Sequence, residues 1–158
     1  MSTTAQLFTA IQSDDIATIQ NLISQNPELV NSKDQRGFTP LIFATYFDKD
    51  AIARFLLEEG ADIDAQDASG NTALIGVSFK GNQNIAKILI EKGAKLNVQN
   101  KMGQTALIFS SLYNKEQSVD LLLEHNADKA IKDNSHMTAY DHAKSKGFDH
   151  LLPKLKVG

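Results

Sequence analysis

Apolar residues alternate between a short continuous run and a longer amphipathic segment three times between residues 35 and 134. The first run is LIFA, residues 41–44. In the segment that follows, Ile52, Phe55 and Leu56 recur at the spacing of one helix face. A step of 33 residues separates the equivalent positions Gly37, Gly70 and Gly103; Thr39, Thr72, Thr105 and Thr138; Leu56, Leu89 and Leu122; and Ala61, Ala94 and Ala127. A period of this length predicts stacked units, each too small to bury its apolar face alone.

Residues at the ends of these segments predict where each helix begins and stops. Thr39 is a candidate N-cap, and Pro40 after it has no N–H to lose in the first turn. The first run stops at Asp48, Gly81, Asn114 and Gly147 in successive units, and the second helix ends at Gly60, Gly93 and Asn126. These residue types tolerate a left-handed backbone, so both positions are predicted turns. Each unit is predicted to be helix, turn, helix and hairpin-like loop.

The repeated segments resemble ankyrin repeats. GFTPLIFA, GNTALIGV and GQTALIFS are each followed by LLEEGAD, LIEKGAK or LLEHNAD, and the resemblance covers almost the whole chain. It implies an all-α solenoid. Two departures stand out. Ile42, Ile75 and Ile108 stand where the family usually has histidine, which implies that apolar packing replaces a polar contact between repeats. Asp50, Gln83 and Glu116 occupy a position of the second helix that is usually apolar.

We expect a single domain over residues 1–158, with a capping repeat at 1–34, three regular repeats at 35–134 and a second capping repeat at 135–158. In the first unit, Thr3 or Thr4 is predicted to cap one helix, Asp14 or Asp15 to cap the next, and the pair at 26–27, NP, to end it. Pro153 is predicted to end or kink a short last helix.

The composition predicts the cellular compartment, and the distribution of charge predicts an electrical polarity. The chain has no cysteine, no membrane-length apolar run and no basic-then-apolar leader, so we expect a cytoplasmic protein without disulfides. The formal net charge is −3, but its distribution is uneven. Residues 1–79 have four Lys or Arg and eleven Asp or Glu, a balance of −7, while residues 80–158 have twelve and eight, a balance of +4. In a solenoid this predicts electrical polarity along the axis, although drift in surface composition also explains it.

Motifs for catalysis, metals and phosphates do not emerge. The glycines between 70 and 76 belong to the repeat pattern and no GxxxxGK[ST] or GxSxG motif occurs. Acidic pairs such as Asp62 and Asp64 fit a solvated loop better than acid–base catalysis. The four histidines, His125, His136, His142 and His150, match no zinc spacing. We expect no enzyme activity, no metal and no cofactor, and the scattered C-terminal lysines argue against nucleic-acid binding.

Because no catalytic, metal or phosphate motif occurs, the candidate functional site is a binding surface. The resemblance implies a concave groove formed by loop tips and by the last turns of the first helices. Aromatic residues, methionines and arginine are enriched in interface hot spots. The predicted partner-binding residues are Arg36, Phe38, Tyr46, Phe47, Asn71, Phe79, Lys80, Met102, Gln104, Leu112, Tyr113 and Met137. Tyr46, Phe79 and Tyr113 are predicted to form a ladder on one wall. The alternative for Phe79 and Leu112 is that they only seal adjacent repeats.

The sequence therefore predicts a monomeric, non-catalytic module that binds another protein through its concave groove, with neither nucleic acid nor membrane as partner. Two alternatives remain open. One is a structural protein that self-assembles through oppositely charged ends, and the other is a metal-binding or enzymatic protein on an atypical scaffold.

Overall fold

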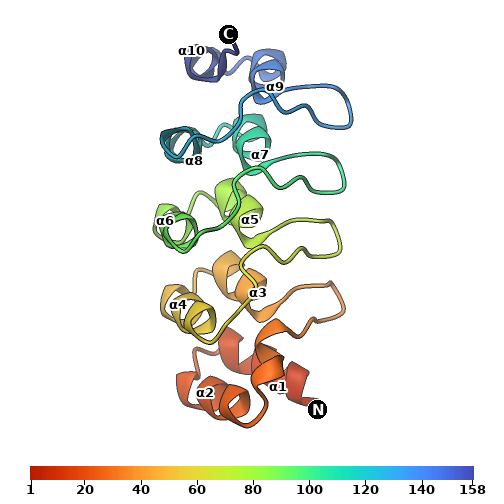
Figure 1. Cartoon of the computed structure of the whole chain (residues 1–158), viewed down its shortest axis with the longest axis vertical. Helices are drawn as coiled ribbons and strands as arrows, with labels where there is room; N and C mark the ends of the chain where they lie inside the picture. Colours follow the sequence, from red (N-terminus) through yellow and green to blue (C-terminus); the bar gives the residue numbers. More distant parts are fainter.

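The computed structural model describes all residues 1–158 and consists of stacked helix pairs (Figure 1). The elements in chain order are α1 (Thr3–Gln12), α2 (Ile16–Gln25), η1 (Pro27–Asn31), α3 (Pro40–Tyr46), α4 (Asp50–Glu58), α5 (Ala73–Lys80), α6 (Gln83–Glu91), α7 (Ala106–Leu112), α8 (Glu116–Glu124), α9 (Ala139–Lys146), η2 (Asp149–Leu151) and α10 (Leu152–Leu155). There is no β-strand, which confirms the predicted all-α repeat fold.

The helices form two columns. The odd-numbered helices α1 to α9 make an inner column, the even-numbered helices α2 to α10 make an outer column, and the long loops project from the inner column on the side away from the outer one (Figure 1). We call the projecting loops fingers; they span residues 32–39, 65–72, 98–105 and 131–138. Chain order is therefore spatial order, so the acidic and basic halves lie at opposite ends of the long axis.

Threonine caps begin the inner helices as predicted. The hydroxyl oxygens of Thr39, Thr72 and Thr105 each accept the backbone N–H three residues later, at 3.1–3.2 Å. Thr138 completes a capping box with Asp141, which accepts the Thr138 N–H in return. The predicted left-handed turns are also confirmed, with φ between +57° and +93° at Asp48, Gly60, Gly81, Gly93, Asn114, Asn126 and Gly147.

Both end units depart from the predictions in detail. The N-cap of α1 is Ser2, whose hydroxyl accepts the Ala5 N–H, so the prediction of Thr3 or Thr4 is wrong by one position. Asp15 caps α2 as predicted. Pro153 lies in the first turn of α10 rather than at a helix end, because a 3₁₀ turn precedes it and its missing N–H is unneeded there. Lys154 of α10 pairs with Glu116 and Asp120 of α8, each at 2.8 Å.

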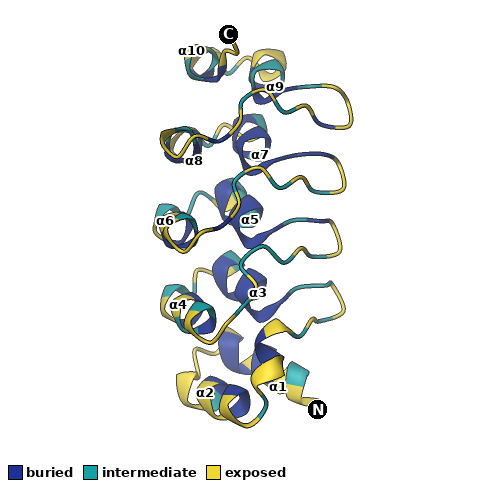
Figure 2. Cartoon of the chain, in the orientation of Figure 1, coloured by how far each residue is buried: buried dark blue, intermediate teal, exposed yellow.

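One continuous apolar core runs through the stack (Figure 2). Leu56, Leu89 and Leu122 are buried on the inward faces of the outer helices. Ile42, Ile75 and Ile108, which replace the usual family histidine, are buried as well. Apolar packing between repeats at this position is therefore confirmed.

The fingers repeat one hydrogen-bonding pattern. An Asp or Asn at positions 34, 67, 100 and 133 accepts the backbone N–H groups two and four residues later through one side-chain oxygen. Adjacent fingers are joined by backbone bonds, of which Lys101 N–H to Ser69 O, at 3.0 Å, is one. Gly70, with φ +79°, permits this approach: a Cβ there would lie 2.8 Å from Lys101 N.

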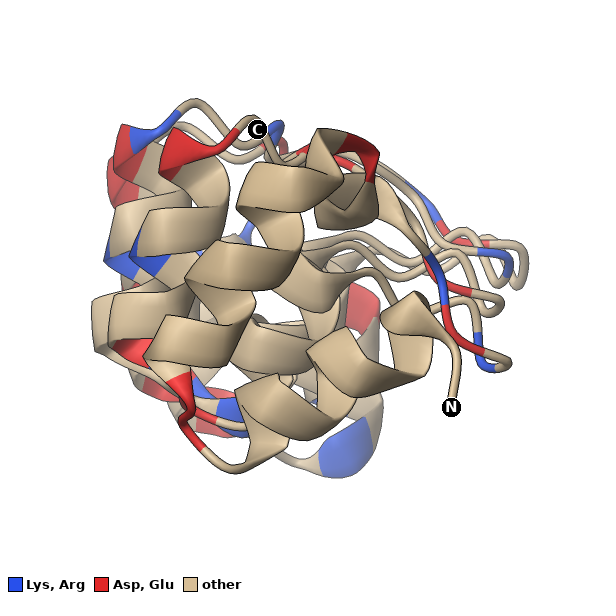
Figure 3. Cartoon of the chain, turned by 90° about the horizontal axis from the view of Figure 1, so that it is seen from below, with Lys and Arg blue, Asp and Glu red and all other residues tan.

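Charged residues lie mainly at helix ends and on the fingers, as the view along the stack shows (Figure 3). The first two helices, α1 and α2, contain none. None of the helices combines the length and the apolar character that crossing a membrane requires.

Candidate functional site

Aromatic rings on the inner column gather in two groups. The first aromatic group contains Phe8, Phe38, Phe43, Tyr46 and Phe47, joined by ring contacts of 4.6–6.3 Å between centroids. The second aromatic group contains Phe79, Phe109 and Tyr113, with centroids 4.7–5.7 Å apart. The predicted ladder of three rings is wrong, because Phe79 contacts Tyr113 but Tyr46 packs in the first group.

The rings reach the surface at the last turns of α3 and α7. Phe47 is 43% exposed and Tyr113 is 47% exposed. Each is the residue directly after its helix, where the chain turns toward the outer column. Helices α3 and α7 are otherwise buried along most of their length, so these turns carry the exposed apolar side chains of the two helices.

Cations lie over several of these rings. The Arg36 guanidinium is 4.4 Å from the Phe38 centroid, and Lys80 Nζ is 4.7 Å from the Tyr46 centroid. Lys115 Nζ lies 5.9 Å from the Phe79 centroid. Arg36 also pairs with Asp34 at 2.7 Å. Burial raises the pKa of Asp34, but the hydrogen bonds from Arg36 and from the Phe38 and Arg36 backbone N–H groups outweigh it, and the pKa lies below its usual value.

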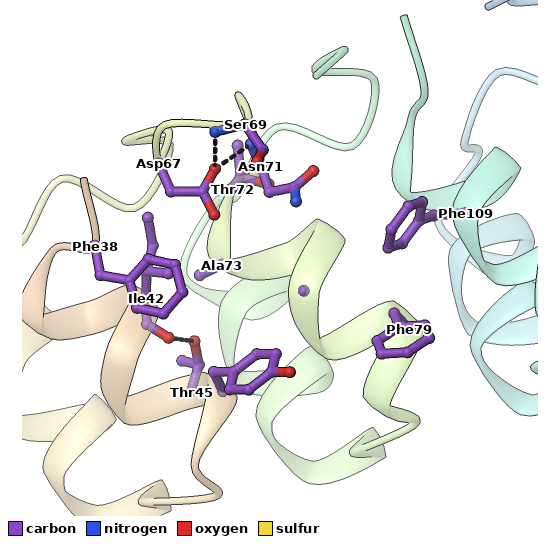
Figure 4. A pocket seen from close by; sticks show the side chains of 12 residues that line it. Phe38, Ile42, Thr45, Asp67, Ser69, Asn71, Thr72, Ala73, Phe79 and Phe109 are labelled. Atoms are coloured by element: carbon purple, nitrogen blue, oxygen red, sulfur yellow. Dashed lines mark hydrogen bonds between the residues drawn. The ribbon is translucent and has the colours of Figure 1, made fainter. Parts of the chain in front are cut away.

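A pocket of about 300 Å³ lies between the two aromatic groups (Figure 4), and Gly76 is one of the α5 residues that line it. We call it the Gly76 pocket. Fingers, α3, α5 and α7 all contribute to its lining, which consists of Phe38, Ile42, Thr45, Tyr46, Asp67, Ser69, Asn71, Thr72, Ala73, Gly76, Phe79 and Phe109. Rings from both groups face this space, and the Asp67 carboxylate lies at its finger side (Figure 4).

The pocket exists because Gly76 has no side chain to fill this space. The equivalent positions in the neighbouring units are Phe43 and Phe109, each 33 residues away, and both fill the space beside them with a ring. A Cβ on Gly76 would lie 4.0 Å from Tyr46 Cδ2, with nothing closer. The middle unit therefore lacks a ring where both of its neighbours have one.

The other predicted residues are distributed over the same face with different exposure. Met102, at a finger tip, is 64% exposed, whereas Leu112 and Met137 are half-buried. Asn71 is half-buried and its Oδ1 accepts the Asn100 side-chain N–H at 2.9 Å. Gln104 is only 5% exposed, so its predicted place among the groove contacts is wrong. Its side chain lies inside the finger layer while its backbone pairs with Asn100.

Sequence reasoning missed Phe109, Gly76 and Asp67. Each has a signal at the 33-residue step: Phe109 and Gly76 share a register with Phe43, and Asp67 shares one with Asp34 and Asp133. The relevance of Gly76 depends on what lies opposite it, which the register alone does not give.

One histidine has a specific partner. His142 Nε2 and Asp133 Oδ2 lie 2.6 Å apart, joining α9 to the last finger. Burial raises the pKa of Asp133, but hydrogen bonds from His142, Met137 N–H and Ser135 N–H and the charge of His142 bring it below its usual value. Nowhere do three or more His, Asp or Glu side chains gather as metal ligands would.

Comparison with known proteins identifies the family to which this repeat architecture corresponds. The family model described as ankyrin repeats (3 copies) matches residues 7–100, 59–133 and 78–152. Palmitoyltransferase akr1 of Schizosaccharomyces pombe is 41% identical over 59 residues, which cover 37% of this chain and 9% of that protein. DNA-binding protein RFXANK is 44% identical over 48 residues in Homo sapiens and 56% identical over 34 residues in Mus musculus.

These relatives match over short segments. The human RFXANK match covers 30% of this chain and 18% of that protein, and the mouse match covers 22% and 13%. The chain therefore spans less than a fifth of the length of these relatives. Ankyrin repeats in general are protein-interaction modules. The family model extends over nearly the whole chain, and the chain belongs to the ankyrin-repeat family.

Proposed function

We propose that this protein binds a protein partner through the groove between its inner helices and its fingers. The observation that carries the proposal is the exposure of Phe47 and Tyr113 at the last turns of inner helices that are otherwise buried. Large aromatic side chains supply much of the energy of protein interfaces when they lie near the interface centre. Lys80 lies over Tyr46 and Lys115 lies over Phe79, rings that contact Phe47 and Tyr113 respectively, so the two lysines add polar contacts next to the exposed rings.

The two tyrosines should separate binding from folding. Truncating an aromatic anchor at an interface centre removes at least ~2 kcal/mol of binding free energy. Tyr113 is about half exposed in the free protein, so Tyr113→Ala should leave the melting curve nearly unchanged while weakening capture of the partner from the native cell. Tyr46→Ala should weaken capture too, with a larger effect on stability because Tyr46 is half-buried whereas Tyr113 is exposed.

Matched controls lie on the outer column. Arg54 of α4 and Lys87 of α6 are exposed residues of the outer column, which lies on the side away from the fingers (Figure 1), so alanine at either position should change neither capture nor melting. If the Arg54→Ala and Lys87→Ala variants lose the partner and the tyrosine variants keep it, the partner binds the outer face and the groove proposal is wrong.

The proposal also includes a monomeric protein that works in the cytoplasm without a cofactor. Size measurements at low and high salt test the first part, because assembly through oppositely charged ends would weaken as salt screens the charges. Cell fractionation tests the second part.

A further inference from the structure

The glycine at position 76 of α5 is unfavourable for the helix and leaves space beside it. Gly76 is an interior residue of α5, where glycine is less favourable than alanine because its backbone loses more freedom on folding. The space beside it accepts a Cβ, since the nearest atom would be Tyr46 Cδ2 at 4.0 Å. Helix stability and packing would both favour a larger residue, so neither explains the glycine.

The size and lining of the pocket suit one large apolar side chain. Its volume of about 300 Å³ is at the lower limit of ligand sites. Phe38 lies on one side, and Phe79 and Phe109 lie on the other (Figure 4). Tyr46, which contacts Phe38, also lines the pocket. Aromatic pairs favour edge-to-face contacts with centroids 4.5–7 Å apart, so a ring inserted between the two aromatic groups can contact both.

Charge at the rim distinguishes the two sides of the pocket. Lys80 and Lys115 stand over rings of the two groups, and neither forms an ion pair with a carboxylate. Asp67 lies at the opposite, finger side, where its Oδ1 accepts the Ser69 and Asn71 N–H groups, each at 2.9 Å. The Arg36 guanidinium on the finger side is already paired with Asp34, so a carboxylate on the ligand is attracted mainly toward the two unpaired lysines at the helix ends.

We propose that the partner inserts a single aromatic side chain into the Gly76 pocket and places neighbouring acidic residues against Lys80 and Lys115. This rests on the proposed function and gives the partner a chemistry: an acidic segment with one aromatic anchor. The pocket supplies the apolar contacts, and the two free lysines supply charge complementarity.

The test uses the full ¹⁵N-labelled chain and three capped peptides: acetyl-GSFEEG-amide, acetyl-GSAEEG-amide and acetyl-GSFKKG-amide. Titration followed by amide chemical shifts gives both the affinity and the place of binding. The first peptide should bind at least ~10-fold more tightly than either of the others, with the largest shifts at Gly76 and Thr72. Equal affinities for the phenylalanine and alanine peptides, tighter binding of the lysine peptide, or no shift at millimolar concentration would each overturn the proposal.

Filling the pocket provides the matched variant. Gly76→Phe restores the residue found at the same register in both neighbouring units, and it should reduce binding of acetyl-GSFEEG-amide by ~10-fold or more. Gly76→Ala should raise the melting temperature and weaken binding by a smaller factor, which keeps the test usable if Gly76→Phe misfolds. Gly93→Ala, at an exposed helix end with no atom within 4 Å, should bind as the wild type does. Unchanged binding by a folded Gly76 variant would show that the peptide binds elsewhere.

The two proposals fail separately. Tyr113 does not line the Gly76 pocket, so loss of partner capture by Tyr113→Ala with no peptide binding would retain the groove and reject the anchor. Peptide binding at Gly76 with normal capture by the tyrosine variants would show a pocket that binds aromatic side chains but would reject the groove as the partner site.

Discussion

The inner helix α3 and the outer helix α4 belong to one unit, yet they bury very different shares of their surfaces. Residues 40–45 of α3 are all buried and only Tyr46 is not, whereas α4 buries Ile52, Ala53 and Leu56 and exposes its remaining face. The outer helices are thus ordinary amphipathic helices whose polar side meets water. Helix α3 is covered by α1 on one side and α5 on the other, so the exposed part of an aromatic side chain at its end, such as Phe47, is available to a partner even though its ring also contacts Phe43. The difference separates residues that hold the stack together from residues available to a partner.

Removing a core side chain from an outer helix should have the largest effect. Leu89 of α6 is fully buried, and Leu89→Ala should lower the free energy of unfolding by about 2–5 kcal/mol, from lost burial and a residual cavity. Urea unfolding measures the loss, and Lys87→Ala on the exposed side of the same helix should change stability by less than about 0.5 kcal/mol. A loss below half a kilocalorie per mole for Leu89→Ala would mean that the outer helix does not pack as described.

A glycine in a finger and a glycine after an outer helix should respond differently to alanine. At Gly70, in a finger, a Cβ would meet Lys101 N at 2.8 Å on a backbone with φ +79°, so Gly70→Ala should destabilise by about 2 kcal/mol or more. At Gly93, after the outer helix α6, φ is +93° but no atom lies within 4 Å, so only the backbone cost of about 1 kcal/mol applies. Thermal melts of both variants compare them directly. Equal losses would show that the fingers do not depend on close approach.

The last finger should weaken in acid. The pKa of Asp133 is lowered in the folded state, so its contribution is complete above the ordinary value of 3.8 and is lost as pH falls below that value through the folded pKa. Asp133→Asn keeps an oxygen for the turn, as Asn100 does in the preceding finger, but loses the charge next to His142. The variant should be less stable at neutral pH and should lose less stability in acid. Unfolding measured from pH 6 to pH 3, with Asp128→Asn as the exposed control, checks this; parallel curves for wild type and variant would contradict it.

Salt should have the smallest effect, and on association rate rather than on affinity. The balance is −7 over residues 1–79 and +4 over residues 80–158, so the ends of the stack have opposite potentials. If a partner has matching polarity, its association rate should fall several-fold between low and high ionic strength, with a weaker change in the dissociation rate. Stopped-flow binding measures both. An association rate that stays constant over a wide salt range would contradict the prediction that charge steers association.

Most of the fold could be predicted because the period fixes residue type and place together. The threonine caps, the left-handed turns and the buried isoleucines follow from local chemistry that recurs every 33 residues. The prediction failed where several neighbouring residues can play the same local role, as at the N-cap of α1. Ser2, Thr3 and Thr4 can all cap a helix, and the sequence does not say which one is aligned with the first free N–H.

The site was predicted less completely, for a physical reason. Phe47 and Tyr113 were predicted because a large aromatic residue at a helix end keeps part of its ring exposed, and both are close to half exposed. Gln104 was placed on the surface because it shares a register with Phe38 and Asn71, but side-chain direction in a finger depends on the fingers beside it. The Gly76 pocket is formed by three successive units, so no single repeat contains it.

The contact between Lys154 and α8 gives the two ends of the stack unequal resistance to fraying. Asp120 and Glu116 raise the pKa of Lys154, mainly because their carboxylates accept hydrogen bonds from its ammonium group. These partners are solvent-exposed, so dissolved ions screen their attraction. The opposite end is closed by uncharged helices with a buried apolar face. Local opening, and with it amide exchange and access for proteases, should therefore begin at α10 in concentrated salt and spread inward from there.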